Sequence, residues 1–116
     1  MAEGPLAAAY RAACERFNAG DTAGFGEILA DDCVFEGSRG RVGSSRAEIV
    51  AAVSATREAL GWQRHELMQA MEEADLLVGL ARNTFGSGEQ FPVGGVMRFR
   101  NGKIIEMRAA GGMAGV

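Results

Sequence analysis

A two-residue turn near the end of the chain most constrains how it can fold. Asn101-Gly102 lies between two runs of alternating residues, 95–99 and 104–108. Asn-Gly is favoured in turns whose two central residues both need a positive φ, and such turns join adjacent antiparallel strands. The sequence therefore predicts that the last two strands form a hairpin. Alternation along these strands then decides which side chains share a face of the sheet.

Two helices are expected near the start of the chain. Apolar residues at helical spacing predict the first over 6–18, with Gly20 at its end. A second helix is expected over 22–30. Gly24 and Gly26 lower its intrinsic stability, so packing against the rest of the protein must hold it.

A third helix is expected in the middle of the chain. Ser44 or Ser45 can cap its first turn, and Glu48 is placed to complete a capping box. The apolar stripe continues to about Leu60, and Gly61 follows it as an end signal. These signals predict a helix of roughly four turns.

The other segments predict antiparallel strands. A short strand is expected over 33–36, followed by a turn-rich link over 37–43. After the third helix, a meander of four strands is expected over 62–72, 76–85, 90–100 and 103–110. Helices followed by a meander favour an α+β fold, with the helices on one face of a curved antiparallel sheet.

Composition and charge narrow the class of partners. The 116 residues suffice for one domain with a single core, and 12 basic residues stand against 15 acidic ones. The basic residues do not form a block, so nucleic acid is not an expected partner. No apolar stretch is long enough to span a membrane, so no membrane contact is expected either. The first residues lack a secretory signal, so a cytoplasmic location is expected. Cys14 and Cys33 lack metal-ligand spacing and are expected to be buried, reduced thiols, a reactive thiol being the alternative.

Three stretches carry a resemblance to a known family. They are residues 17–21, 30–37 and 98–109. With the order of elements between them, the chain resembles the nuclear transport factor 2-like superfamily, and in particular its ketosteroid-isomerase and polyketide-cyclase (SnoaL-like) branch. The resemblance implies a single domain over 1–116 with a cone-shaped, curved antiparallel sheet wrapped around three N-terminal helices. This is a cystatin-like α+β roll with a pocket at its wide end.

The catalytic residues of that branch do not carry over. Its ketosteroid isomerases use one carboxylate to move a proton, and a tyrosine with a protonated acid to stabilise the oxyanion. By the resemblance, these groups fall at Gly37, Ala13 and near Gly95. Polyketide-cyclase relatives often have an Asp at the end of the last strand, where this chain has Ala-Gly-Gly-Met at 110–113. True ketosteroid isomerase activity is therefore not expected.

An apolar pocket is expected on the inner face of the sheet. Gly95 fills no volume there, and Met97 and Met107 are expected side by side with adaptable side chains. A core that these residues fill completely is the alternative. The residues expected to line the pocket are Tyr10, Phe17, Phe35, Val78, Leu80, Val93, Gly95, Met97, Phe99, Met107 and Ala109.

Three residues are candidates for catalysis. His65 has an unperturbed pKa near neutrality, although a lone histidine on a strand is more often structural. Arg82 interrupts an apolar run and either reaches solvent or grips a carboxylate or enolate oxygen at the pocket mouth. Glu36 could act as a base if it pointed inward, but its alternation with Gly37 suggests that it points away.

These observations predict a small-molecule-binding protein with an apolar pocket. Catalysis, if present, would be proton transfer without a cofactor, as in an isomerase, cyclase or dehydratase acting on a small hydrophobic substrate. The alternative is a non-catalytic ligand-binding or dimerisation module on the same fold. An inward carboxylate or histidine would favour the enzyme. The resemblance also implies a homodimer through the outer sheet face around Val96 and Ile105.

Overall fold

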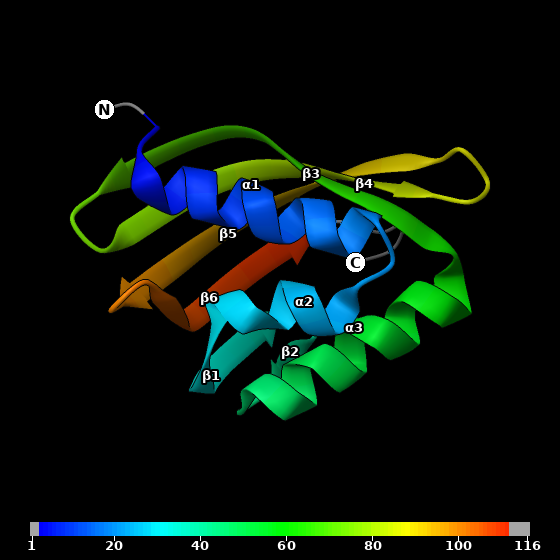
Figure 1. Ribbon diagram of the computed structural model, residues 1–116. Coiled ribbons are helices and arrows are strands. Elements are labelled where there is room, and N and C mark those ends of the chain that lie inside the picture. Colours follow the sequence, from blue (N-terminus) through cyan, green and yellow to red (C-terminus); the bar gives the residue numbers. More distant parts are fainter. Residues whose placement is uncertain (1–2, 112–116) are drawn as a thin grey trace.

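The computed structural model describes residues 3–111, and the helices come from the first half of the chain. Figure 1 shows α1 and α2 running across the sheet and α3 lying beside them. The helical elements are α1 (Pro5–Asn18), α2 (Thr22–Phe25), the 3-10 turn η1 (Gly26–Ile28) and α3 (Arg46–Leu60).

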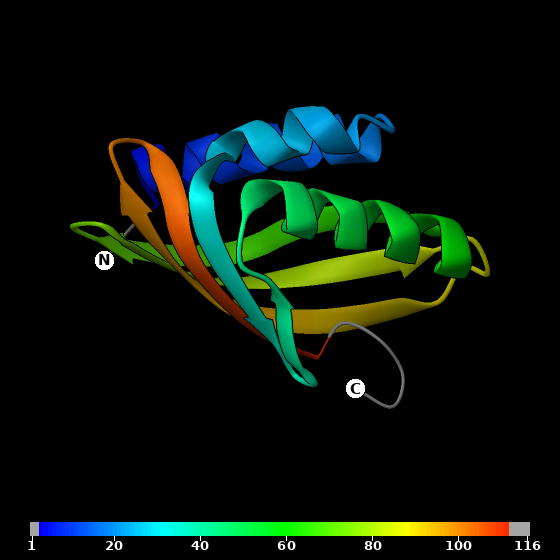
Figure 2. The same ribbon diagram turned by 90° about the horizontal axis from the view of Figure 1, so that it is seen from below.

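The strands form one curved sheet with the order β2-β1-β6-β5-β4-β3. Figure 2 shows the helices gathered on one side of this sheet, which bends around them. Neighbouring strands are antiparallel except β1 and β6, which run parallel. The described architecture confirms the predicted α+β roll. The strands are β1 (Leu29–Gly37), β2 (Gly40–Gly43), β3 (Trp62–Glu73), β4 (Leu76–Phe85), β5 (Gln90–Arg100) and β6 (Lys103–Gly111).

The predicted hairpin between β5 and β6 is confirmed. Asn101 has a φ of 52° and Gly102 a φ of 78°, as a two-residue turn of this kind requires. The pairing then shifts between Arg98 and Phe99, where β6 contains one extra residue. Because of this bulge, Met97 pairs with Met107. An unbroken ladder from the turn would have placed a different residue opposite Met97.

Capping groups explain where the long helices begin and end. Ser45 caps α3 by accepting a hydrogen bond from the Glu48 N–H, and the Glu48 carboxylate accepts one from the Ser44 N–H. Gly61 closes α3 with a φ of 63°. At the start of α1, Glu72 of β3 accepts hydrogen bonds from backbone N–H groups of the first turn. The capping of α3 agrees with the prediction.

The segment after α1 differs from the prediction. Instead of one helix over 22–30, α2 ends at Phe25, η1 follows, and β1 begins at Leu29. The two glycines contribute little to helix stability, and the Leu29 backbone pairs with Ile104 of β6 instead. The turn-rich link also differs, since Gly40–Gly43 forms strand β2 against the end of β1.

The core lies between the helices and the concave face of the sheet. Its fully buried side chains come from both layers, namely Phe17, Leu29, Cys33, Ile49, Leu77 and Ile104. Cys14 and Cys33 are buried free thiols, as expected, and burial raises their pKa values to about 12 and about 11. Within residues 3–111, no helix has the length and apolar character needed to cross a membrane.

Candidate functional site

A cavity of about 320 Å³ lies between the concave sheet face and the helices. It exists because small residues from three adjacent strands meet at one level of the sheet. Gly79 of β4 pairs with Gly95 of β5, which pairs with Ala109 of β6. The next level repeats the pattern, with Ala81 paired to Val93. The sheet therefore leaves space that larger side chains would have filled.

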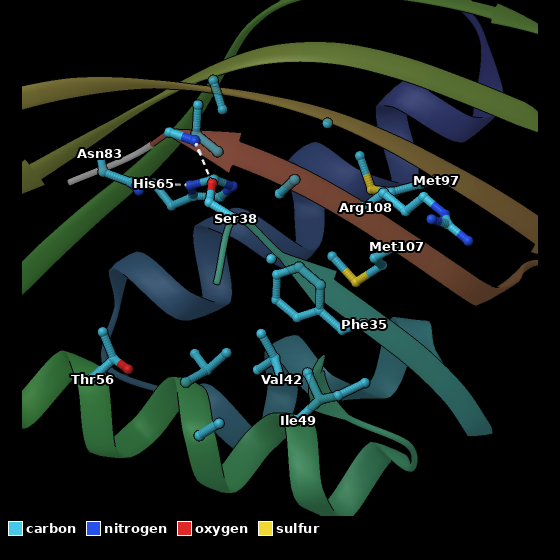
Figure 3. A pocket seen from close by; sticks show the side chains of 18 of the residues that line it. Phe35, Ser38, Val42, Ile49, Thr56, His65, Asn83, Met97, Met107 and Arg108 are labelled. Atoms are coloured by element: carbon cyan, nitrogen blue, oxygen red, sulfur yellow. Dashed lines mark hydrogen bonds between the residues drawn. The ribbon is translucent and has the colours of Figure 1, made fainter. Parts of the chain in front are cut away.

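Large side chains close the cavity on one side of these small residues. Met97 and Met107 lie next to each other, and Phe35 of β1 pairs with Met107. Figure 3 shows the two methionines and Phe35 together at one end of the cavity. Methionine side chains adapt to irregular neighbours, so this wall can adjust to what it contacts.

Helix α3 and the β1–β2 hairpin form the opposite wall. Ile49 and Thr56 of α3 face the sheet across the cavity, and Val42 of β2 lies beside them (Figure 3). At the exposed rim, the Ser38 hydroxyl accepts a hydrogen bond of 3.1 Å from the Gly111 N–H. This contact joins the tip of the hairpin to the end of β6.

A buried polar cluster lies at the far end of the cavity. The Tyr10 hydroxyl of α1 lies 2.8 Å from His65 Nε2, and His65 Nδ1 lies 2.5 Å from Asn83 Oδ1. His65 and Asn83 are paired neighbours on β3 and β4, which brings their side chains together. All three residues border the cavity. Asn18 fixes the strand below them by accepting a hydrogen bond of 2.8 Å from the His65 N–H.

Aromatic rings pack around the imidazole of this cluster and bury it. Edge-to-face contacts join His65 to Tyr10, to Phe17 and to Trp62. Burial lowers the pKa of His65 below its ordinary 6.5, and the hydrogen bond to Asn83 offsets this only in part. Burial also raises the pKa of Tyr10 well above 10.0. Both side chains are therefore neutral at physiological pH.

Among the described residues, the charged ones that border the cavity are three arginines, Arg39, Arg41 and Arg108. Among residues 3–111, those bordering the cavity include no aspartate or glutamate. Arg41 contacts the Glu36 carboxylate at 3.0 Å and the Ser44 hydroxyl at 2.7 Å. Arg108 pairs with the Glu106 carboxylate at 3.3 Å. Neither Glu36 nor Glu106 borders the cavity.

Most of the residues expected around a pocket do border this cavity. Besides His65, they are Tyr10, Phe17, Phe35, Val93, Gly95, Met97, Met107 and Ala109. Three expected lining residues lie elsewhere. Val78 and Leu80 are 38% and 45% exposed on the outer sheet face, because strand alternation along β4 turns them away from the helices. Phe99 is buried in the core next to the hairpin turn.

Two of the candidate catalytic residues point away from the cavity. Arg82 pairs with Glu66 at 3.3 Å on the outer face, one residue from the inward-facing Asn83. Glu36 pairs with Arg41 beside the β1–β2 hairpin. Of the two readings of Arg82, the structure has the side chain on the outer face and not at the mouth of this cavity, because strand alternation turns it away from the helices.

The positions that the family resemblance assigns to catalytic groups have no such groups. Gly37 and Gly95 border the cavity, whereas Ala13 is buried in α1 away from it. The Asp of polyketide-cyclase relatives would fall within residues 110–113 at the end of the last strand. Residues 112 and 113 of this stretch lie outside the described part of the chain. Tyr10, one helical turn before Ala13, is the tyrosine that reaches the cavity.

Sequence reasoning missed two residues that shape the site. Gly79 lies opposite Gly95 and enlarges the cavity, and Asn83 orients His65. The hairpin turn after Glu73 would by itself pair His65 with Thr84, but a bulge near Met68 shifts the register by one residue. Gly79, a glycine inside a strand, was the signal available in the sequence.

Comparison with known proteins places the chain in a family. The sequence profile of the SnoaL-like domain matches residues 10–107, which is most of the chain. The protein therefore belongs to the SnoaL-like domain family, within the nuclear transport factor 2-like superfamily. A comparison with curated proteins finds no match.

Solved structures of distant relatives share the fold. An NTF2-like protein of unknown function from Burkholderia xenovorans has a TM-score of 0.78 at 19% identity, covering 92% of this chain and 82% of its own. A putative isomerase of the SnoaL-like family from Agrobacterium tumefaciens has a TM-score of 0.73 at 18% identity, covering 93% and 95%. A cystatin-fold protein from Novosphingobium aromaticivorans has a TM-score of 0.75 at 19% identity, covering 92% and 98%. These likenesses show the common fold.

Proposed function

We propose that this SnoaL-like protein binds a small, mainly apolar molecule in the cavity between its sheet and helices. The single observation that carries the proposal is the level of small residues formed by Gly79, Gly95 and Ala109 beneath a volume of about 320 Å³. Cavities of this size that are lined mainly by apolar and aromatic side chains are typical small-molecule sites. Burial of an apolar ligand there would be favourable without any cofactor.

Filling the cavity from the sheet tests this proposal. Gly95→Leu adds a side chain on the cavity face, where a Cβ would meet the Arg108 carbonyl oxygen at 3.3 Å, so a small backbone shift is needed. We expect the variant to bind an apolar fluorescent probe at least about tenfold more weakly, which corresponds to about 1.4 kcal/mol. Native mass spectrometry of the purified parent protein would show whether a small molecule is already held.

The neighbouring glycine provides the matched control. A Cβ at Gly94 would have no atom within 4 Å, and this residue lies on the opposite face of β5. Gly94→Leu is therefore expected to bind the probe as the parent does. Equal probe affinity in all three proteins would refute binding in this cavity. A large loss of thermal stability in Gly95→Leu, with no probe bound by the parent, would indicate a filled core.

A second candidate function is proton transfer without a cofactor. It is favoured by His65, a neutral imidazole at the cavity whose Nε2 is hydrogen bonded to the Tyr10 hydroxyl. The Tyr10 oxygen could take a proton from a bound molecule while passing its own proton to Nε2. The absence of a carboxylate among the described lining residues favours the non-catalytic alternative.

A general proton-transfer substrate separates the two candidates. A nitrobenzisoxazole opens its ring when a base removes one C–H proton, and it is small and apolar. If the cluster is catalytic, His65→Phe should lower the ring-opening rate by about 10²-fold or more. Arg82→Gln, on the outer face, serves as the control and should keep the rate. A parent that binds the substrate but opens it no faster than His65→Phe does would be a ligand-binding protein.

The outer sheet face supports a second proposal, that two copies of the chain form a dimer through it. Large apolar side chains are exposed on adjacent strands of this face, including Val78 of β4 and Val96 of β5, which pair with each other. Charged pairs such as Arg82 with Glu66 and Arg98 with Glu106 flank them. An apolar patch with a charged rim suits a two-fold contact between identical surfaces.

A further inference from the structure

The hydrogen bonds of the buried cluster have a defined direction. Asn83 Oδ1 can only accept a hydrogen bond, so the nearby His65 Nδ1 must carry the proton. A neutral imidazole carries one N–H, and Nε2 is therefore an acceptor. The Tyr10 hydroxyl must then donate its only proton to Nε2 across 2.8 Å.

The Tyr10 oxygen consequently presents lone pairs and no proton to the cavity. A hydroxyl oxygen has two lone pairs, and they remain able to accept hydrogen bonds after the proton has been donated. A group that meets Tyr10 from the cavity must therefore donate a hydrogen bond.

The surroundings also select the charge of the ligand. His65 is neutral, and the described lining residues include no carboxylate. The three lining arginines, Arg39, Arg41 and Arg108, belong to the β1–β2 hairpin and to β6, not to the elements that carry the polar cluster. An ionised group next to Tyr10 and His65 would lose its hydration without meeting an opposite charge within the cluster. The deep end of the cavity thus suits a neutral group.

We infer that the cavity takes a neutral, mainly apolar molecule that carries a hydroxyl group, and that this hydroxyl donates a hydrogen bond to the Tyr10 oxygen. The inference rests on the proposed ligand-binding function and names the class of ligand. It also reverses the polarity of an oxyanion site, because the protein accepts the hydrogen bond and the ligand donates it.

Three matched probes test the inference on the parent protein. A naphthol has the hydroxyl, its methyl ether keeps the oxygen but lacks the proton, and naphthalene lacks both. Their affinities are measured by displacement of an apolar fluorescent probe. We expect the naphthol to bind about tenfold more tightly than the ether or naphthalene. The absorption spectrum of the bound naphthol should be that of the neutral form, and not of the naphtholate.

Two variants assign the contact to one residue. Tyr10→Phe keeps the ring and removes the acceptor, so the naphthol should lose its advantage over the methyl ether. Thr22→Val is the matched control, because it removes a hydroxyl that pairs with Ser54 at 2.8 Å outside the cavity. The control should keep the parent's order of affinities. If Tyr10→Phe fails to fold, the order of the three probe affinities and the ionisation state of the naphthol bound to the parent protein still test the inference.

The outcomes distinguish this inference from the proposed function. Binding of none of the probes would refute both. Equal binding of naphthol and ether, binding of the naphtholate form, or an unchanged preference in Tyr10→Phe would overturn the inference alone and leave an apolar cavity without this polar selection.

Discussion

The charge of His65 is set by the side chains that surround its ring. Aromatic contacts and burial remove water from the imidazole, and its two nitrogens are occupied by Tyr10 and Asn83. Burial disfavours the charged form and lowers the pKa, while the Asn83 hydrogen bond raises it to a smaller extent. A histidine that looks isolated in the sequence is thereby the centre of a neutral hydrogen-bonded cluster.

This shift predicts a loss of stability in mild acid. The folded pKa lies below 6.5, so the unfolded chain binds more protons as the pH falls through that value. Above pH 6.5 the group contributes no pH dependence; below it, stability should decrease until the folded pKa is passed. Urea unfolding between about pH 7 and about pH 5 measures this decrease.

His65→Gln identifies the source of the effect. The variant lacks the titrating ring, so the free energy of unfolding should depend less on pH over the same interval. Glu72 does not interfere, because its pKa lies below 4.5. If the parent and the variant lose stability in parallel, the imidazole is not the group responsible.

At the scale of elements, one carboxylate fastens α1 to the sheet. Glu72 of β3 accepts hydrogen bonds from the backbone N–H groups of Gly4 at 2.6 Å, Leu6 at 3.1 Å and Ala7 at 3.0 Å. Pro5 between them has no N–H to satisfy. These contacts combine hydrogen bonding with the favourable position of a negative charge at a helix N-terminus. They hold the helix that carries Tyr10.

Glu72→Gln should therefore destabilise the protein at neutral pH. Desolvation raises the pKa of Glu72, but the backbone N–H groups of Ala7, Leu6 and Gly4 outweigh it and hold the pKa below 4.5. The stabilisation is present above pH 4.5 and is lost as the pH falls through the folded pKa. Thermal melting at neutral and acidic pH measures both effects. Glu73→Gln, in the exposed neighbouring position, is the control; an equal effect there would contradict the role of Glu72.

The β5–β6 hairpin gives a second prediction at this scale. Gly102 has a φ of 78°, a conformation in which a Cβ costs about 1–2 kcal/mol. Gly102→Ala should lower the free energy of unfolding by about that amount. Gly94→Ala, in the same β5–β6 hairpin but without a positive φ, should leave it unchanged or raise it by up to about 1 kcal/mol. Chemical denaturation compares the two, and equal effects would refute the role of the turn.

At the scale of the whole molecule, the sheet has two different faces. The concave face carries the core and the cavity, and the outer face exposes large apolar side chains of β3, β4 and β5: Met68, Met71, Val78, Leu80 and Val96. Strand alternation separates the two sets, so one sheet can serve both a ligand site and a contact between copies.

The proposed dimer predicts sedimentation at twice the chain mass at micromolar concentration. Val96→Glu places a charge in the middle of the outer face and should shift the protein toward the monomer. Leu60→Glu is the control, because it introduces the same charge at another exposed apolar residue. Leu60 is 49% exposed, against 39% for Val96, and it lies at the end of α3. A parent that sediments as a monomer would refute the dimer. Dissociation caused by Leu60→Glu would move the interface to α3.

Local signals in the sequence were sufficient for most of the fold. The Asn101-Gly102 turn, the Ser45 cap with Glu48 and the glycine after α3 each act within a few residues, so their effects can be read without the rest of the chain. The bounds of β4 and β5 followed from alternation and flanking turns. The segment after α1 differs from the prediction because the start of β1 pairs with β6, a strand that is far away in sequence.

The cavity and its polar cluster depended on contacts between distant segments. A bulge near Met68 pairs His65 with Asn83, and a bulge next to Phe99 pairs Met97 with Met107. Each bulge shifts the register by one residue, which reverses the face of every side chain beyond it. The sequence alone determined most of the elements, the turn and the family. The tertiary structure decided which small residues meet at one level and which polar groups join Tyr10, because packing between sheet and helices selects the register.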